Sequence, residues 1–224
     1  MRNGDLYKMT EDWSDISQAD WGMQSESVTD KRLDKSTAKT SSHRRSTECI
    51  ELSDKFLMRR AFGEDQLLQR MGIEPLLQDH SYHCITGGNV DSLSYLKVVL
   101  LHAKHLNYLL CSTWCMAAED IYQLQEWVET GVIDKLDMYV GEIFPSTYLV
   151  EWRMLNELYA KHPNIGRVKC FRNHSKIFAG FSEKFDFAIE TSANINTNPR
   201  TEQGVINISH DLAVFYKNYF DNIN

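Results

Sequence analysis

The feature that most constrains the fold is the alternation of apolar strand-like segments with amphipathic helical segments from Tyr82 onward. Residues 106–114 are almost continuously apolar, which is typical of a strand buried on both faces of a sheet. Apolar residues at helical spacing follow over 117–129, where Gly131 is a natural stop, and over 146–161, ahead of Pro163. This alternation predicts an α/β domain in which helices flank a layered mixed sheet.

The remaining elements of this domain follow from the same patterns. A strand is expected near Tyr82, a helix over 93–105 and a strand over 135–140. Four further strands are predicted at 167–171, 175–181, 185–191 and 204–208. A last helix is expected after Ser209, because serine is a favourable N-cap residue.

The N-terminal part of the chain differs in composition from the rest. Residues 1–48 are rich in Ser, Thr, Asp and Lys and carry few aliphatic side chains, so they are predicted to form a disordered tail. Within this tail Trp13 and Trp21 are either isolated apolar residues or a short partner-binding segment. Residues 49–79 are predicted to form a helical lead-in, and residues 80–224 the folded domain.

Composition indicates the compartment and the absence of cross-links. A hydrophobic content of 42% supports a real core. No apolar run is long enough to cross a bilayer and the first residues lack a signal-peptide pattern, so a cytoplasmic protein without stable membrane association is expected. The five cysteines are odd in number and scattered, which predicts reduced thiols.

A candidate phosphate site lies between His174 and Gln203. Alternate side chains of a strand share a face, so His174 and Lys176 are expected to project together. Histidine can form a covalent intermediate, and a lysine ammonium can neutralise the charge of a phosphodiester as phosphorus is attacked. Ser192 and Asn194 repeat the same spacing on the next predicted strand.

This pattern resembles the phospholipase D superfamily, whose signature is His-x-Lys, then an Asp, then a Gly-Ser-x-Asn element. The resemblance covers roughly residues 80 to 222, looks closest to a bacterial and phage subgroup, and is carried by His174, Lys176, Ser192, Asn194 and the downstream acid Glu202. The chain departs from the signature at Phe181, where the Asp is expected, and at Thr191, where the glycine is expected.

The resemblance implies metal-independent phosphodiester hydrolysis through a phosphohistidine intermediate, without a cofactor. His174 would attack phosphorus in its neutral form, Lys176 and Asn194 would hold the non-bridging oxygens, and Ser192 would add a hydrogen bond. Glu202 would accept the other ring N–H of His174, and Arg200 is a weaker candidate for binding a substrate phosphate. Because the chain carries one copy of the motif, the second histidine is expected from the partner in a two-fold homodimer.

The charge pattern bears on the substrate. The net charge of −7 is unfavourable for an extended nucleic-acid-binding surface, but a local basic stretch coincides with the motif and comprises Arg167, Lys169, Arg172, Lys176, Lys184 and Arg200. By analogy with the resembled family, and without a membrane-binding helix, nucleic acid is the expected substrate. The alternatives are a non-catalytic phosphate- or DNA-binding module of the same fold, and a phospholipid hydrolase.

Other combinations of functional residue types in the chain have structural explanations. His102 and Lys104 also spell His-x-Lys, but on a predicted helix, where positions two apart point in different directions. Cys111 and Cys115 with His102 and His105 have no spacing typical of a zinc site, so buried free cysteine is the favoured interpretation. Glu142 follows a predicted strand, and an exposed acid there could reach a site at the strand ends.

Overall fold

The computed structural model describes residues 55–196 and 200–223, with side chains from residue 60 onward. The chain divides into two compact units, Met1–Ile50 and Glu51–Asn224, and every described residue belongs to the second unit. The predicted disordered tail at 1–48, with Trp13 and Trp21, lies outside the described residues.

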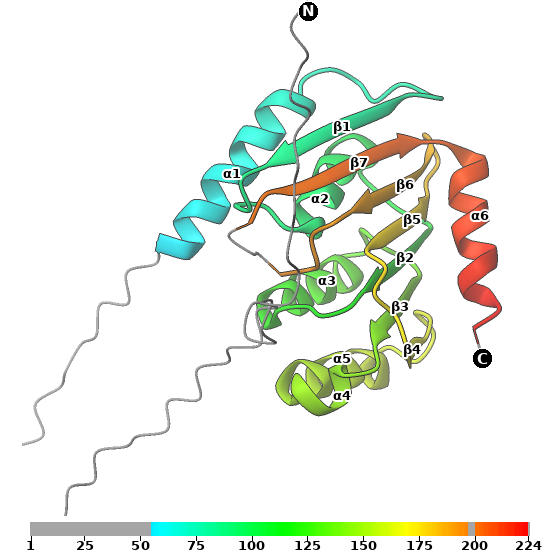
Figure 1. Cartoon of the computed structure of the whole chain (residues 1–224). Coiled ribbons are helices and arrows are strands. Elements are labelled where there is room, and N and C mark those ends of the chain that lie inside the picture. Colours follow the sequence, from blue (N-terminus) through cyan, green and yellow to red (C-terminus); the bar gives the residue numbers. More distant parts are fainter. Residues whose placement is uncertain (1–54, 197–199, 224) are drawn as a thin grey trace, which may run out of the picture. The chain divides into compact units, whose positions relative to one another are not determined.

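The second unit is built on a seven-stranded mixed sheet, which confirms the predicted fold class (Figure 1). The strands run in the order β1-β7-β6-β5-β2-β3-β4. Strands β2, β3 and β4 are mutually parallel, and the other neighbouring pairs are antiparallel. Their bounds are β1 Ser81–Thr86, β2 Tyr108–Thr113, β3 Leu136–Gly141, β4 Val168–Phe171, β5 Ile177–Phe181, β6 Asp186–Thr191 and β7 Glu202–Ile208.

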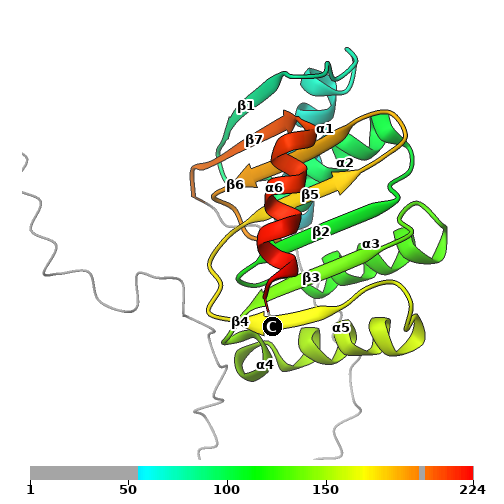
Figure 2. The same cartoon turned by 90° about the vertical axis from the view of Figure 1, so that its right-hand side faces the viewer.

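Helices cover both faces of the sheet, as the alternating pattern predicts. Figures 1 and 2 show α1 to α5 on one face and α6 on the other. The helices are α1 Lys55–Met71, α2 Ser92–Ala103, α3 Ala118–Glu129, α4 Phe144–Thr147, α5 Leu149–Lys161 and α6 His210–Asp221. Ser209 caps α6 as expected, since its hydroxyl accepts a hydrogen bond from Leu212 N at 3.3 Å.

Two expected elements differ from the structure. The helix expected over 146–161 is two helices, α4 and α5, which meet at Tyr148. A proline in the first turn of α4 fits a separate helix start, because proline is tolerated there. Strand β5 begins at Ile177 rather than residue 175, so His174 and Lys176 lie in the segment before the strand.

The sheet separates a large and a small apolar core. Strand β2 contributes to both: Leu109 and Cys111 pack in the core beneath α1, α2, α3 and α5, and Leu110 packs in the core beneath α6. The side chains of Leu109, Leu110 and Cys111 are all fully buried, which confirms that both faces of β2 are covered. Among the described residues, no helix is both long enough and apolar enough to cross a membrane.

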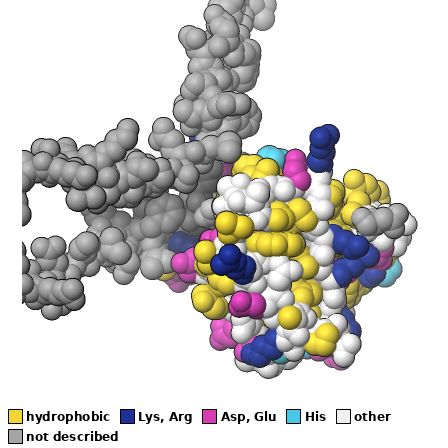
Figure 3. Space-filling model, turned by 90° about the horizontal axis from the view of Figure 1, so that it is seen from below, with side chains coloured by type: hydrophobic (Ala, Val, Ile, Leu, Met, Phe, Trp, Pro, Cys, Tyr) yellow, Lys and Arg dark blue, Asp and Glu magenta, His cyan; other side chains and the backbone are white. Residues whose placement is uncertain are grey.

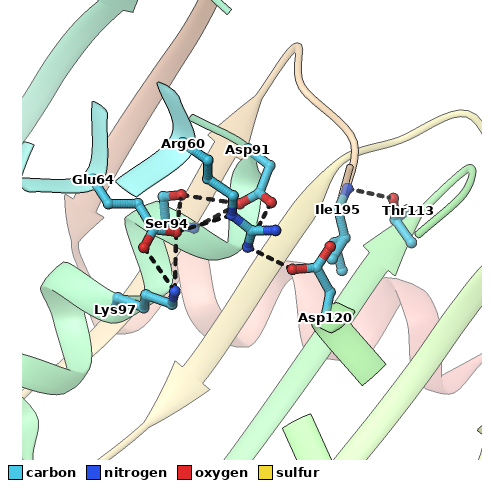
Figure 4. Close-up of polar contacts among 8 residues, drawn as sticks. All are labelled: Arg60, Glu64, Asp91, Ser94, Lys97, Thr113, Asp120 and Ile195. Atoms are coloured by element: carbon cyan, nitrogen blue, oxygen red, sulfur yellow. Dashed lines mark hydrogen bonds and ion pairs between the residues drawn. The ribbon is translucent and has the colours of Figure 1, made fainter. Parts of the chain in front are cut away.

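Helix α1 is held to the domain by a buried ion cluster (Figure 4). Arg60 Nη2 lies 2.8 Å from Asp91 Oδ2 and 2.6 Å from Asp120 Oδ1. Asp91 also caps α2 by accepting a hydrogen bond from Ser94 N at 3.0 Å. Burial, followed by the neighbouring Asp91 charge, raises the pKa of Asp120 to about 7. One guanidinium therefore joins the starts of two helices to α1.

Candidate active site at one edge of the sheet

The sheet topology brings the predicted site residues together at one end of the strands. Strands β2, β3 and β6 end on this side of the sheet, and the antiparallel strands β5 and β7 begin there. His174 and Lys176 immediately precede β5, Ser192 and Asn194 follow β6, and Glu202 opens β7. Residues that come from separate segments of the chain are therefore neighbours in space.

Lys176 points at the imidazole of His174. Its Nζ lies 2.9 Å from His174 Nδ1 and 2.7 Å from His174 O. Because an ammonium only donates hydrogen bonds, Nδ1 is the acceptor. The Lys176 side chain is buried, whereas His174 is exposed. The structure thus presents the imidazole to solvent with a buried cation behind it.

The surroundings favour the neutral form of His174. Burial, and then the Lys176 charge, lowers the pKa of His174, while Glu142 opposes this shift. Burial also lowers the pKa of Lys176, and the Glu202 carboxylate is among the groups that oppose that shift. Glu142 lies just after β3, so the acid at this strand end does act on the site electrostatically.

Ser192 and Glu202 bind each other. The Ser192 hydroxyl donates a hydrogen bond to Glu202 Oε2 and accepts one from Gln203 N at 2.9 Å. Among the described contacts none joins Glu202 to the ring of His174, so the expected pairing of these two residues is not what the structure shows. The physical reason is that Ser192 lies between β6 and the start of β7 and takes the Glu202 carboxylate itself.

Asn194 is fixed through its carbonyl oxygen. Its Oδ1 accepts a hydrogen bond from Trp114 N at 3.3 Å, and its backbone oxygen accepts one from Ser92 N at 3.1 Å. No described contact uses the Asn194 Nδ2 group. The neighbouring residue Ile195 is held by Thr113 Oγ1, at 3.2 Å from Ile195 N (Figure 4). The amide N–H groups of Asn194 are thereby left to serve as donors.

Trp114 is a site residue that the sequence did not reveal. Its ring lies 5.5 Å from that of His174, centroid to centroid, at an angle of 44°. Gly141 makes room for it, because a Cβ atom at Gly141 would come within 2.5 Å of Trp114 Cδ1. The S-T-W-C-M segment marked the end of a strand, but nothing local indicated which histidine this tryptophan would meet.

Asn173 fixes the segment that carries His174, and it too was missed. The side chain is 5% exposed, and its Nδ2 donates to Ser112 Oγ at 2.9 Å and to Tyr139 O at 3.0 Å. Its Oδ1 accepts hydrogen bonds from Ser175 N at 3.0 Å and Ser175 Oγ at 2.7 Å. This amide therefore ties the segment to β2 and β3.

Phe181 and Thr191, where the chain departs from the resembled signature, lie at different distances from the site. Phe181 pairs with Asp186 at the far end of β5, where its ring packs 5.9 Å from that of Tyr108. Thr191 ends β6, and its hydroxyl donates to Ala193 O at 2.7 Å. The threonine thus contributes to the turn that carries Ser192 and Asn194. Arg200 is exposed, beyond the three undescribed residues that precede it.

The site opens into a depression of about 420 Å³, called here the phosphate depression. It is lined by His174, Ser175, Lys176, Ile177, Glu190, Thr191, Ser192 and Tyr216. Tyr216, from α6, donates a hydrogen bond from its hydroxyl to the carboxylate of Glu190, which also lines the depression. The depression therefore presents an imidazole and a cation, which suit a phosphate group, whereas the hydroxyl groups in its lining donate to other groups of the protein.

The competing combinations of residues lie elsewhere. His102 Nε2 is 3.1 Å from Met71 O, and Lys104 is the C-cap of α2, so this second His-x-Lys sequence is part of a helix end. Cys111 is fully buried in β2. In the described part of the chain, no group of three or more His, Cys, Asp and Glu side chains is arranged to hold a metal ion.

Comparisons with known proteins give remote likenesses. No family model and no curated protein matches the chain. Among solved structures, polyphosphate kinase from Porphyromonas gingivalis is 12% identical with a TM-score of 0.48, over 67% of this chain and 29% of that one. Phosphatidylserine synthase from Haemophilus influenzae is 13% identical with a TM-score of 0.46, over 61% of this chain and 36% of that one. The chain thus spans about a third of each of these two proteins.

Proposed function

We propose that this protein is a metal-independent phosphodiester hydrolase of the phospholipase D type, acting on nucleic acid as a cytoplasmic homodimer. The observation that carries the proposal is the pairing of the exposed His174 with the buried Lys176 in the phosphate depression, with the Lys176 ammonium 2.9 Å from the imidazole. A nucleophile and a neighbouring cation are groups that phosphoryl transfer through histidine uses, and Asn194, which follows the same strand β6 as Ser192, is proposed as a further donor.

The first step forms a phosphohistidine. The Nε2 lone pair of His174 attacks phosphorus, a P–N bond forms, and the bond to the leaving oxygen breaks. Lys176 and the Asn194 amide bind the non-bridging oxygens and neutralise the charge that develops on them. The leaving oxygen takes a proton from His174 of a second copy of the chain, which acts here in its imidazolium form, the form that the lowered pKa disfavours. The exposure of His174 leaves it accessible to that copy.

The second step returns the protein to its starting state. Water attacks phosphorus, the neutral imidazole of the second copy takes a proton from it, and the P–N bond breaks. Glu202 contributes through its charge on Lys176 and through Ser192, whose hydroxyl it holds. Arg200 follows the same segment and is proposed to bind a neighbouring phosphate of the substrate.

Substrate binding must first rearrange the Lys176 contact. With Nδ1 accepting a hydrogen bond, the proton of the neutral ring lies on Nε2, which then has no lone pair for attack. A phosphate anion attracts the ammonium more strongly than a neutral ring nitrogen does, so its arrival would draw Lys176 away and free Nδ1 for the proton. Lys176 in this way couples phosphate binding to the active tautomer.

Hydrolysis of bis(p-nitrophenyl) phosphate in EDTA tests the proposal. The wild type is expected to release p-nitrophenol, His174→Ala to lose this activity, and His83→Ala, which alters an exposed histidine of β1, to retain it. A radiolabelled phosphodiester should leave an alkali-stable, acid-labile label on the wild type alone. Equal rates for the wild type and His174→Ala would refute the histidine mechanism.

A second candidate is a non-catalytic phosphate-binding module of the same fold. It is favoured by the same contact between Lys176 and Nδ1, because this holds the ring in the tautomer that cannot attack. Binding of phosphate or DNA by the wild type, without any turnover in the hydrolysis assay, would support it over the enzyme.

A further inference from the structure

A second cavity adjoins the phosphate depression and extends from His174 along α6. It measures about 390 Å³, which falls within the range of small-molecule sites, roughly 300–1,000 Å³. We call it the aromatic groove; its walls include Phe171, Arg172, His174, Phe215, Tyr216 and Tyr219.

Helix α6 presents the aromatic rings of this groove. Phe215 and Tyr219 are four residues apart and so lie on the same side of the helix, 60% and 58% exposed. Phe220 is buried behind them and anchors the helix, with its ring 4.7 Å from that of Tyr139 and 6.4 Å from that of Phe171. The exposed rings are therefore carried on a fixed support.

The groove is continuous with the candidate active site. His174, Ser175, Ile177 and Tyr216 line both the groove and the phosphate depression. A ligand whose phosphate lies at His174 would therefore place its adjoining group among the rings of α6.

The charge around the groove favours an anionic ligand. Arg172 lines it, and Lys169 lies on the same face of β4 as Phe171, because alternate residues of a strand share a face. Figure 3, seen from below, shows Lys and Arg side chains, and also Asp and Glu side chains, among hydrophobic ones on this face of the molecule. Two of the carboxylates described nearby are occupied: Asp221 pairs with Arg167 and Lys217, and Glu190 accepts the Tyr216 hydroxyl. A third, Glu142, is exposed and acts on His174 through its charge.

The groove fits a nucleobase better than an acyl chain. Ile177 is the one aliphatic side chain in its described lining, and the rest is mainly aromatic rings, an arginine and polar groups. Flat π faces and guanidinium planes stack on bases regardless of sequence. In a duplex these base faces are already stacked and paired, so only an unpaired base could enter.

We propose that the aromatic groove binds an unpaired base next to the scissile phosphate, so that the substrate is single-stranded nucleic acid. This inference rests on the proposed function for the position of the phosphate. Phe215 and Tyr219 are the stacking residues, and Arg172 contributes a charged planar surface.

Binding of short oligonucleotides tests the inference. Fluorescence anisotropy with labelled dT12, an abasic strand of equal length and a 12-bp duplex is measured in EDTA, with His174→Ala in every protein to prevent cleavage. The parent is expected to bind dT12 more tightly than either other probe. Adding Tyr219→Ala or Phe215→Ala should weaken dT12 binding roughly tenfold, as expected for loss of one stacked base, without changing abasic binding. Tyr219→Phe should restore it, and Tyr122→Ala, which removes an exposed tyrosine of α3, should have no effect.

Several outcomes would overturn the inference. They are equal binding of dT12 and the abasic strand, preference for the duplex, or tight binding to phosphatidylglycerol vesicles that Tyr219→Ala abolishes. A fall in molecular mass on light scattering with Tyr219→Ala would instead assign the groove to contact between copies. The hydrolysis assay separates the two proposals: turnover without preference for dT12 refutes the groove alone, and preference for dT12 without turnover refutes the catalytic function alone.

Discussion

At the scale of single residues, the surroundings of His174 lower the pKa of its imidazole. Partial burial and then the Lys176 charge disfavour the imidazolium, and Glu142 favours it. The neutral nucleophile should therefore persist at pH values somewhat below the ordinary histidine range.

Substitutions at these two neighbours should move the His174 pKa in opposite directions. Lys176→Met removes a positive charge and should raise it, whereas Glu142→Gln removes a negative charge and should lower it. NMR titration of the His174 ring protons measures both shifts, with the exposed His83 as an internal reference. An unchanged pKa in Lys176→Met would show that the ammonium does not stay at Nδ1 in solution.

The buried amide of Asn173 holds the segment that carries His174. Asn173→Ala removes a buried amide and leaves Ser112, Ser175 and Tyr139 O without their partner, so the free energy of unfolding should fall by about 1–3 kcal/mol. Hydrolysis should fall further than stability explains, because the segment before β5 loses its attachment. Denaturant unfolding and kcat at a temperature where the variant is folded measure the two effects. Asn156→Ala, at an exposed position of α5, is the control.

At the scale of elements, the cluster around Arg60 joins α1 to α2 and α3. Arg60→Met leaves Asp91 and Asp120 buried without a cation, and should cost about 3–5 kcal/mol, as breaking a buried pair does. Urea unfolding measures it, with Arg153→Met on the exposed part of α5 as the control. A loss below 1 kcal/mol would show that α1 is held by its other contacts, which are its apolar packing and the pairing of Glu64 with Lys97 and Ser94.

Asp120 in the same cluster predicts a pH dependence. Its pKa is raised to about 7 in the folded chain, so its contribution to stability is present below the unfolded value near 3.8 and is lost as pH rises through 7. Asp120→Asn can still accept the Arg60 hydrogen bond but does not titrate. The difference in unfolding free energy between the wild type and Asp120→Asn should therefore shift against the wild type by about 1–3 kcal/mol from pH 5 to pH 8. A constant difference across this range would contradict the raised pKa.

The element scale also shows the limit of sequence patterns. Periodicity predicted the described strands, in most cases within one or two residues, because alternation and helical spacing are local properties. The break at Tyr148 between α4 and α5 was not predicted, since the apolar spacing continues across it. Likewise, the motif spacing suggested that His174 and Lys176 project together from a strand, whereas the two residues precede β5 and the lysine turns back to its neighbour.

At the scale of the whole molecule, the proposed mechanism requires two copies. When wild type and His174→Ala are unfolded together, refolded and assayed at constant total protein, mixed dimers should be inactive because each reaction uses both histidines. Activity should then follow the square of the wild-type fraction. A linear dependence would show that one copy suffices, and mixing wild type with His83→Ala should leave activity unchanged.

The sequence by itself determined the α/β class, most of the strands and helices, and the candidate residues His174, Lys176, Ser192, Asn194 and Glu202. These follow from local periodicity and from short motif spacing. Only the tertiary structure decided the strand order that gathers them at one edge, the pairing of Glu202 with Ser192, and the places of Trp114 and Asn173. It also decided that α6 carries its rings beside His174. The physical reason is that such contacts join segments far apart in the chain, and their partners are chosen by the packing of the whole sheet rather than by any local pattern.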